Sequence, residues 1–216
     1  LRALAGTTFR APTFNDLYYP VECYPVWGCF GGNPTLKPEE ALNREVGVAW
    51  ERGNVSVGLT YFNNRAKNLI DWSSGIASNV GTANIQGVEA SLATLLAGYR
   101  VRASVDLLDA EDKQTGDELG RRASVGGSLG IERASGAWVW GMEWNGQGRR
   151  YDRIPNNAAS RLDGYGLLNA YVHYAVAPDW SVELRANNLL DKDYELAQNY
   201  GTQGANAFIA VRYAMH

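Results

Sequence analysis

Hydrophobic and polar residues alternate along several stretches of this chain, and residues 99–107 give the clearest example. The apolar or aromatic positions there are Tyr99, Val101, Ala103, Val105 and Leu107, and the positions between them are mostly charged. A period of two predicts a β-strand with two unlike faces. Comparable stretches predict about ten strands in all, at residues 1–9, 42–51, 55–62, 88–96, 99–107, 123–132, 138–145, 168–176, 180–187 and 207–215.

The expected connections alternate between short turns and long loops. The turns fall near residues 52–54, 97–98, 134–136 and 177–179, and the loops near residues 10–41, 64–83, 109–119, 148–163 and 191–204. This asymmetry, with strands of about 9–13 residues, is typical of outer-membrane barrels, whose strands must be that long to cross a bilayer when tilted. A soluble β-sandwich has shorter strands and lacks the asymmetry. We therefore expect an all-β fold, a transmembrane antiparallel β-barrel.

The composition agrees with membrane-crossing strands and argues against two other classes of protein. The mean hydropathy is −0.30 and no run of about 18 apolar residues occurs, so the sequence contains no candidate transmembrane helix. Its 7 Trp and 12 Tyr outnumber its 5 Phe, as expected where amphipathic rings lie at a membrane interface. The net charge of −3 and the pI near 5.5 give no electrostatic reason to expect a nucleic-acid partner.

The two cysteines, Cys23 and Cys29, both stand in the first long loop. In an oxidising compartment, two cysteines this close in sequence are expected to form a local disulfide, although two free thiols remain the alternative. A metal site is a weaker interpretation, because His173 and His216 are the only histidines in the sequence and neither is near the pair.

The strand predicted at residues 180–187 ends in an unusual corner, which reads Asn-Leu-Leu-Asp-Lys-Asp-Tyr from Asn188 to Tyr194. Asn and Asp side chains form hydrogen bonds to nearby backbone groups, so here they would close the end of the strand. Further short segments stand upstream, in the order Phe9–Pro12 with Leu17-Tyr18, Gly32–Glu40 (GNPTLKPEE), Asn84–Ala90 (NIQGVEA), Leu119–Ala123 (LGRRA) and Gly148–Asp152 (GRRYD). Together these segments resemble TonB-dependent outer-membrane receptors over nearly the whole chain, and the last two resemble the cobalamin-receptor subfamily.

The resemblance implies a barrel of about 22 strands with a plug domain inside it. Residues 1–216 would then be the C-terminal part of that barrel, without the plug and without the short box on which the inner-membrane TonB complex pulls. The expected location is the outer membrane of a Gram-negative bacterium, in contact with its lipid and with the C-terminus in the periplasm. An open sheet of ten strands would leave two unpaired edges, which lipid does not tolerate.

The resemblance also implies the ligand and the residues that contact it. Cobalamin is the favoured ligand, and a siderophore or haem is the alternative, because divergent loops determine the choice. By position in the subfamily pattern, Arg121 corresponds to an arginine at the mouth of the lumen and Tyr200 to an aromatic residue of the last loop. Tyr151 and Trp72 are weaker candidates as loop aromatics. The alternatives are an ion pair for Arg121, the aromatic girdle for Tyr200, and the girdle or loop packing for Trp72.

Two other functional classes are less favoured. A porin without a plug would need neither the corner at residues 188–194 nor the segment at residues 32–40. An outer-membrane enzyme would need a nucleophile beside a base, and no such pair can be named around His173 or His216. We therefore expect a receptor without catalytic residues.

The acidic stretch at residues 109–119 raises the question of a calcium site, because oxygen-rich loops bind that ion. Its carboxylates are those of Asp109, Glu111, Asp112, Asp117 and Glu118. The spacing matches no known calcium loop, so a solvated acidic turn is favoured. In the family, the calcium-binding loops lie upstream of this segment, so we expect calcium only in the full-length receptor.

The chain departs from the family pattern in two places. Residues 21–31, which include both cysteines, read as an insertion in the first loop. Met215 stands where the family usually has the aromatic residue that the barrel-assembly machinery reads. Recognition by that partner is therefore expected to be altered.

Overall fold

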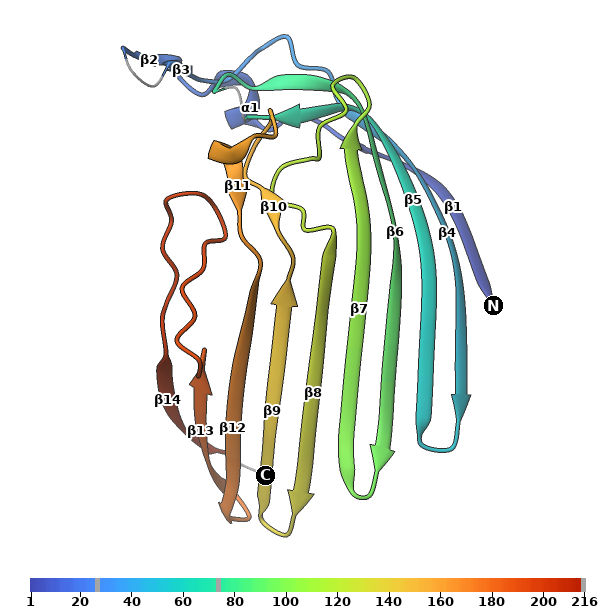
Figure 1. Cartoon of the computed structure of the whole chain (residues 1–216), viewed down its shortest axis with the longest axis vertical. Helices are drawn as coiled ribbons and strands as arrows, with labels where there is room; N and C mark the ends of the chain where they lie inside the picture. The colour runs from blue at the N-terminus through green and yellow to red at the C-terminus, as the bar shows by residue number, and fades with distance from the viewer. Residues whose placement is uncertain (26–27, 73–74, 215–216) are drawn as a thin grey trace.

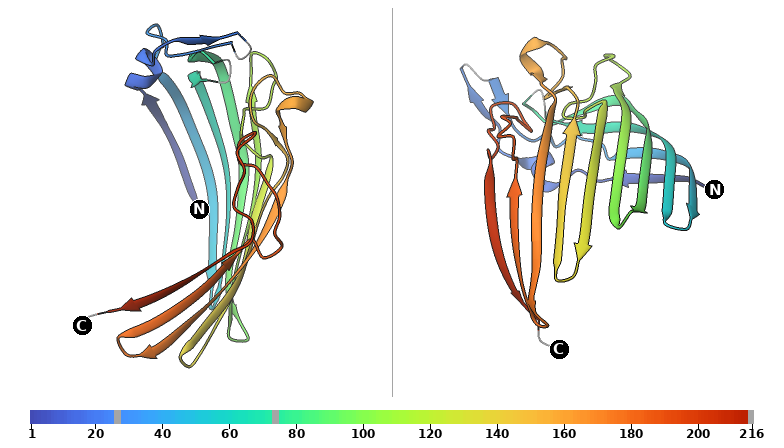
Figure 2. Two further views of the ribbon diagram at one scale, coloured as in Figure 1. Left: turned by 90° about the vertical axis from the view of Figure 1, so that its left-hand side faces the viewer. Right: turned by 60° about the horizontal axis from the view of Figure 1, so that its bottom comes forward.

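The protein, seen in a computed structural model that describes residues 1–25, 28–72 and 75–214, consists mainly of one antiparallel sheet of ten strands. Each strand pairs with the next along the chain, so the edges of the sheet are β1 and β14 (Figure 1). The strands are β1 Arg2–Arg10, β4 Glu39–Arg52, β5 Val55–Asp71, β6 Ser78–Leu96, β7 Tyr99–Asp112, β8 Val125–Ser135, β9 Trp138–Gln147, β12 Tyr165–Ala177, β13 Trp180–Asn187 and β14 Asn206–Tyr213. All ten predicted strands are confirmed, and the sheet curves like part of a barrel wall (Figure 2).

Tight turns connect strands at one end of the sheet, the lower end in Figure 1, and the long loops lie at the opposite end. The turns occupy residues 53–54, 97–98, 136–137 and 178–179, between the ends of consecutive strands. In the second of them, Ala97 and Gly98 both have positive φ, 51° and 81°. Positive φ at both central residues is the requirement of a type I′ hairpin turn, which matches the twist of the two strands it connects.

Several strands extend farther toward the long loops than the hydrophobic pattern predicts. The loop expected at residues 64–83 is wrong, because β5 continues to Asp71 and β6 starts at Ser78, which leaves only residues 72–77 between them. The upper halves of both strands carry polar pairs, such as the 2.9 Å hydrogen bond from Asn63 Nδ2 to Asn84 Oδ1. Backbone pairing continues there although the apolar alternation has ended, so hydrophobicity alone does not reveal it.

Apolar side chains cover one face of the sheet and align from strand to strand. Leu59 pairs with Val48 on one side and Ala90 on the other, and Leu129 pairs with Trp144. Val48 and Leu59 are each 52% exposed. A continuous exposed apolar face of this kind marks a surface that another apolar phase covers, here lipid. The described residues contain no helix that is long and apolar enough to span a membrane.

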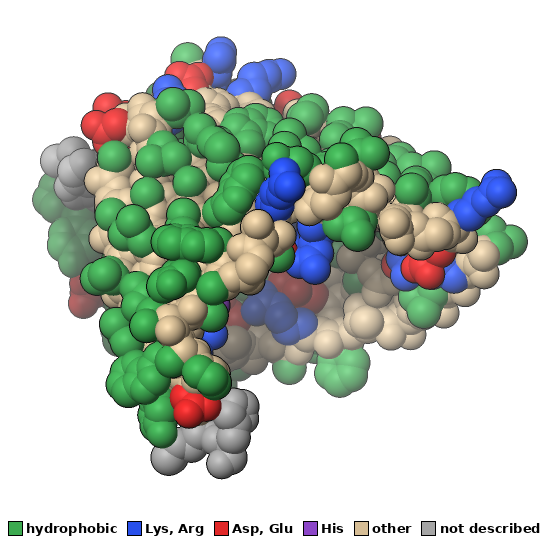
Figure 3. Space-filling view, turned by 90° about the horizontal axis from the view of Figure 1, so that it is seen from below, with side chains coloured by type: hydrophobic (Ala, Val, Ile, Leu, Met, Phe, Trp, Pro, Cys, Tyr) green, Lys and Arg blue, Asp and Glu red, His purple; other side chains and the backbone are tan. Residues whose placement is uncertain are grey.

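The opposite face is polar and forms the hollow of the curved sheet. Figure 3 shows this hollow from below, with Lys, Arg, Asp and Glu side chains inside it and hydrophobic side chains over the outer surface. Glu132 forms an ion pair with Arg100 and accepts a 2.6 Å hydrogen bond from the hydroxyl of Tyr171. The guanidinium of Arg2 lies 2.7 Å from the carboxylate of Glu45. The predicted polar rows of the strands therefore line the lumen side of the sheet.

The first long loop folds into a short helix and a disulfide-linked hairpin. Helix α1 spans Phe14–Tyr18, and strands β2 (Glu22–Tyr24) and β3 (Gly28–Phe30) pair antiparallel. The structure joins Cys23 to Cys29 in a disulfide, with S–S 2.05 Å. Gly31 then forms a parallel bridge with Ile76, which attaches the hairpin to the connection between β5 and β6.

The corner after β13 has the hydrogen bonds that its sequence predicts. Asn188 has a φ of 49° and is 3% exposed. Its Oδ1 accepts a 2.9 Å hydrogen bond from the backbone N–H of Lys192, and its Nδ2 donates to the carbonyls of Lys192 and Gln203. Asp191 Oδ1 accepts a 2.7 Å hydrogen bond from the backbone N–H of Ala205. These bonds join the two ends of the last loop where β13 stops and β14 starts.

Candidate ligand-binding site

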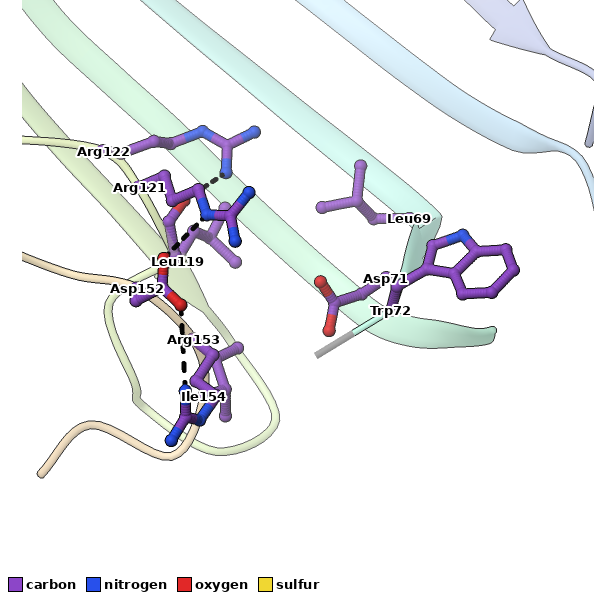
Figure 4. Close-up of a pocket in the computed structure, with 10 residues that line it drawn as sticks. Leu69, Asp71, Trp72, Leu119, Arg121, Arg122, Asp152, Arg153 and Ile154 are labelled. Atoms are coloured by element: carbon purple, nitrogen blue, oxygen red, sulfur yellow. Dashed lines mark hydrogen bonds and ion pairs between the residues drawn. The ribbon is translucent and has the colours of Figure 1, made fainter. Parts of the chain in front are cut away.

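A cavity of about 320 Å³ lies at the long-loop end of the sheet, between segments that are distant in sequence. Its lining comes from the end of β5 and the residue after it, from residues 119–122 after β7, and from residues 152–154 after strand β10 (Arg150–Tyr151) (Figure 4). Three guanidinium groups and two carboxylates meet the apolar side chains of Leu69, Leu119 and Ile154 there. This mixture suits a ligand with both polar and apolar parts.

Asp152 is the residue that holds the arginines of this cavity in place. Its Oδ1 accepts a 2.8 Å hydrogen bond from Arg121 Nε, and its Oδ2 lies 3.8 Å from Arg153 Nη1. The Asp152 side chain is 8% exposed, whereas that of Arg121 is 60% exposed. Arg121 therefore has the ion pair that the sequence left open as its alternative role, and its side chain is still more than half exposed.

The backbone around Arg121 fits the same arrangement. Arg121 has a φ of 59°, and its N–H donates a 2.6 Å hydrogen bond to the carbonyl of Tyr151. The left-handed conformation turns the chain so that Arg121 and Arg122 can both line the cavity. Arg122 Nη1 lies 3.4 Å from the carbonyl of Gly120.

Trp72 lines the cavity but also packs against the first long loop. Its Nε1 donates a 2.9 Å hydrogen bond to Oδ1 of Asp16 in α1, and its ring meets that of Tyr19 edge-on, with 6.1 Å between the centroids. In Figure 4 the indole points away from Arg121, whereas Asp71 points toward the arginines. Loop packing, the alternative role expected for Trp72, is therefore present in the structure.

Tyr151 and Tyr200 are not among the residues that line this cavity. Tyr151 adjoins it through its backbone carbonyl, and its hydroxyl lies 3.4 Å from Arg149 Nη1. Tyr200 is 73% exposed in the last loop. Of the four residues expected to bind ligand, the structure thus brings Arg121 and Trp72 to one cavity and places the two tyrosines beside it or apart from it.

The last loop is nevertheless tied to the cavity wall through Gln198. Its backbone N–H donates a 3.3 Å hydrogen bond to Asp152 Oδ1, and its side-chain oxygen accepts a 2.7 Å bond from Arg153 Nη1. Its Nε2 also donates to the carbonyl of Ala159. Asp152 therefore connects the loop that carries Tyr200 to the loop that carries Arg121.

Asp152, Arg122 and Arg153 were not among the residues expected at a site. Two of them could have been found from the family resemblance. Arg122 lies in the LGRRA segment and Asp152 in the GRRYD segment, and both segments carried that resemblance. Nothing in the hydrophobic pattern indicates that residues 121 and 152 meet. Their contact depends on how two loops fold over the end of the sheet.

The acidic stretch differs in position from its prediction. Asp109, Glu111 and Asp112 belong to β7, so the loop expected from residue 109 is wrong and starts only after Asp112. Asp112 is 3% exposed and accepts a 2.8 Å hydrogen bond from the backbone N–H of Gln114, which closes a tight turn. In the described part of the chain, no three His, Cys, Asp or Glu side chains gather in a way that could hold a metal ion.

His173 lies on the polar face of β12, where it pairs with Glu183 of β13 and Val139 of β9. It is therefore remote from the loop-end cavity, whose lining residues all lie at or beyond the long-loop ends of the strands. His216 lies outside the described residues, as does Met215.

Comparison with known proteins agrees with this geometry. The family model "TonB dependent receptor-like, beta-barrel" matches residues 1–189. The chain is 33% identical over 98% of its length to "Vitamin B12 transporter BtuB" of Photobacterium profundum, and 29% identical over 99% of its length to the protein of the same name from Vibrio cholerae. It covers 34% of each of these proteins, so it spans about a third of the curated relatives it matches.

Solved structures show the same fold at lower identity. The "Copper transporter OprC" superposes with a TM-score of 0.78 at 18% identity, covering 98% of this chain and 36% of that one. The siderophore receptor PirA from Acinetobacter baumannii superposes with a TM-score of 0.78 at 20% identity, covering 98% of this chain and 38% of that one. The relatives are transporters and receptors by name rather than enzymes. The chain belongs to the TonB-dependent receptor β-barrel family of outer-membrane proteins.

Proposed function

We propose that this chain is the C-terminal part of the barrel of an outer-membrane receptor for cobalamin. The observation that carries the proposal is its 33% identity, over 98% of the chain, to a vitamin B12 transporter. In the proposed receptor, strands outside this chain pair with the edges β1 and β14 and close the barrel around a plug. The long loops face the outside of the cell, and the C-terminus faces the periplasm.

The cavity beside Arg121 supplies one contact region for the edge of this large ligand. Cobalamin presents amide groups, a phosphodiester and apolar ring faces. Guanidinium groups donate to amide and phosphate oxygens in a fixed geometry, and the half-exposed side chains of Arg121 and Arg153 are available for that. Tyr200, 73% exposed on the loop that Gln198 ties to Asp152, supplies an aromatic face nearby. Tyr151 and Trp72 stabilise the loops around the cavity through their hydrogen bonds to Arg121 and Asp16.

Uptake is energised by the TonB complex, which acts on a segment outside this chain. We therefore expect loss of the TonB complex to abolish uptake and to leave binding unchanged. A full-length receptor in cells that lack the TonB complex binds cobalamin at the surface but does not accumulate it. Accumulation at the normal rate in such cells would contradict the energised mechanism.

The test of the ligand is a titration of the purified full-length receptor with cyanocobalamin and, separately, with a ferric siderophore, followed by tryptophan quenching with and without calcium. We expect saturable cyanocobalamin binding that weakens in Arg121→Ala and in Tyr200→Ala. Arg161→Ala is the matched control for the arginine, because Arg161, on the short strand β11 (Arg161–Leu162), is also about half exposed but does not line the cavity. Tyr24→Ala, on the disulfide-linked hairpin, is the control for the tyrosine.

A ferric siderophore is the alternative ligand, because solved structures of siderophore receptors share the fold. Their identities of 20% support a common architecture and leave the ligand open. Saturable siderophore binding without cyanocobalamin binding would replace the proposed ligand and keep the receptor class.

A further inference from the structure

The hairpin of β2 and β3 in the first long loop depends on its disulfide. Each strand has three residues, and all of them are exposed. Within the described residues the two strands form a sheet of their own, which lies beyond the long-loop ends of the large sheet (Figure 1). A two-stranded hairpin on its own is marginally stable in water at best. Cys23 and Cys29 are its middle cross-strand pair, so their disulfide constrains the whole hairpin.

The chain that returns from this hairpin packs against the connection between β5 and β6. The N–H of Gly31 donates a 3.1 Å hydrogen bond to the carbonyl of Gly75, and the carbonyl of Gly31 accepts a 2.9 Å hydrogen bond from the N–H of Ala77. All three residues are buried. The carbonyl of Cys29 lies so close to Gly75 that a Cβ there would collide with it. These contacts, called the Gly31–Gly75 clamp below, attach the hairpin to the connection.

The clamped connection also carries one wall of the cavity beside Arg121. Asp71 ends β5 and Trp72 follows it, and both line the cavity (Figure 4). The carbonyl of Trp72 accepts a 2.9 Å hydrogen bond from the N–H of Gly75. A short series of contacts therefore joins the disulfide to the cavity, through Cys29, the clamp and Trp72.

We propose that the Cys23–Cys29 disulfide positions the cavity wall that Asp71 and Trp72 form. The inference rests on the proposed function, because it takes this cavity as a contact region for the transported ligand. While the disulfide is closed, the hairpin keeps the carbonyl of Cys29 and the backbone of Gly31 against Gly75. When the disulfide is broken, the hairpin gains many conformations, the clamp opens in most of them, and the wall loses its fixed position.

The expected consequence is a ligand affinity that depends on the redox state of the disulfide. If only a fraction of receptors has the wall in its binding position, the apparent dissociation constant rises in inverse proportion to that fraction. A fall of the fraction to about 20% weakens binding about fivefold. Cys23 and Cys29 do not themselves line the cavity, so the effect acts through the position of the wall. The closed form is the one expected outside the cell, which is an oxidising compartment.

The first test measures cyanocobalamin binding by the purified full-length receptor before reduction, after reduction by dithiothreitol and after reoxidation. The dithiol gives up two electrons and two protons and closes into its own disulfide, while the S–S bond of the receptor breaks and each sulfur takes one proton. We expect reduction to weaken binding about fivefold and reoxidation to restore it. The double variant Cys23→Ser, Cys29→Ser should bind as weakly as the reduced receptor and should not respond to the dithiol. Unchanged affinity after reduction, or an equal response in the double variant, would overturn the proposal.

Gly75→Ala tests whether the effect passes through the clamp. The added methyl group collides with the carbonyl of Cys29, so the clamp opens while the disulfide stays closed. This variant should bind about fivefold more weakly, and reduction should weaken it little further, because both changes break the same contact. Gly116→Ala is the matched control, since Gly116 also has a positive φ, 79°, at the long-loop end, and a Cβ there meets no atom within 4 Å. Additive effects of Gly75→Ala and reduction would overturn the role of the clamp.

Hydrogen exchange tests the clamp without any ligand. The amide of Ala77 should exchange roughly tenfold faster in the reduced receptor, because it loses its hydrogen bond to Gly31. The amide of Leu108, which donates a 2.9 Å hydrogen bond to the carbonyl of Ser124, should exchange at the same rate in both states. Unchanged exchange at Ala77 would overturn the proposal whatever the ligand is. If the oxidised receptor binds no cyanocobalamin, the proposed ligand is wrong, and the same redox comparison is made with the ferric siderophore.

Discussion

The indole nitrogen of Trp72 donates a 2.9 Å hydrogen bond to Oδ1 of Asp16, which joins two loops whose residues are 56 positions apart. Asp16 is 7% exposed, and its other oxygen accepts a 2.8 Å hydrogen bond from the backbone N–H of Thr13. One buried carboxylate thus starts helix α1 and anchors the connection between β5 and β6. The contact positions the first long loop beside the candidate site.

Replacing Trp72 by Phe should loosen this junction. Phenylalanine keeps an aromatic ring but removes the donor, which leaves an oxygen of a buried carboxylate unpaired, at a cost of about 1–3 kcal/mol. We expect faster hydrogen exchange and faster proteolysis in residues 13–36, measured on the full-length receptor. Trp138→Phe, at the short-turn end of the sheet, is the control that should leave these rates unchanged. Unchanged rates in Trp72→Phe would show that the hydrogen bond does not hold the loop.

The same junction should weaken in acid. Burial raises the pKa of Asp16, but hydrogen bonds from Thr13 and Trp72, with the charge of Arg10, lower it more, so the net pKa lies below the ordinary value. A carboxyl group with a lowered pKa stabilises the folded state fully above its unfolded pKa of about 4 and loses that contribution as the pH falls through its folded pKa. Pepsin cleavage within residues 13–36 should therefore rise as the pH falls from about 4 toward 2. Asp16→Asn should abolish most of this pH dependence, and a persistent dependence in that variant would assign it to another group.

Asp152→Asn should affect ligand binding more than stability. The Arg121 side chain is 60% exposed, so its ion pair with Asp152 contributes at most about 1 kcal/mol to stability. The same ion pair orients Arg121 at the cavity, and its loss should weaken cyanocobalamin binding on the order of fivefold. Titration of the full-length receptor measures this, with Asp163→Asn as the control, since Asp163 is 87% exposed in its pair with Arg161. Equal affinities for both variants would show that Asp152 does not position a ligand contact.

Asn188→Ala should destabilise the corner between β13 and β14. The side chain of Asn188 forms three hydrogen bonds to backbone groups, and its loss leaves at least one of those groups unpaired, at a cost of about 2 kcal/mol. The temperature at which the barrel loses its heat-modifiable migration should fall. Asn188→Gly separates the two causes, because glycine accepts the φ of 49° but provides no hydrogen bond. A transition temperature for Asn188→Gly equal to that of the unmodified receptor would assign the effect to backbone conformation alone.

Much of the fold could be predicted from the sequence, because alternate residues of a membrane strand face lipid and the polar lumen and differ in polarity accordingly. Lipid requires apolar side chains on the outer face, so Val46, Val48 and Trp50 identified β4 as a strand before its partners were known. The same reasoning failed above the membrane. The outward residues that follow Tyr61, namely Asn63, Arg65 and Lys67, are polar, and the continuation of β5 to Asp71 rests on backbone pairing with β6 that no hydrophobic period signals.

The candidate site was predictable only in part. Arg121 and Trp72 could be named from family position and from aromatic character in a loop. The place of Arg121 in that cavity depends on Asp152, which stands 31 residues from Arg121 and pairs with it across two loops, and the place of Trp72 depends on its hydrogen bond to Asp16. Local sequence cannot specify such a contact, because nothing within either loop determines where the other one lies.

By itself, the sequence determined the order and faces of the ten strands, the end of the sheet at which each connection lies, and the corner at Asn188. These features depend on residues close together in the chain, through strand periodicity, turn residues and local side-chain hydrogen bonds. Tertiary structure alone decided how far the strands extend and which loop residues share the cavity. Those properties depend on cross-strand register and loop packing, which bring together residues that the chain itself keeps apart.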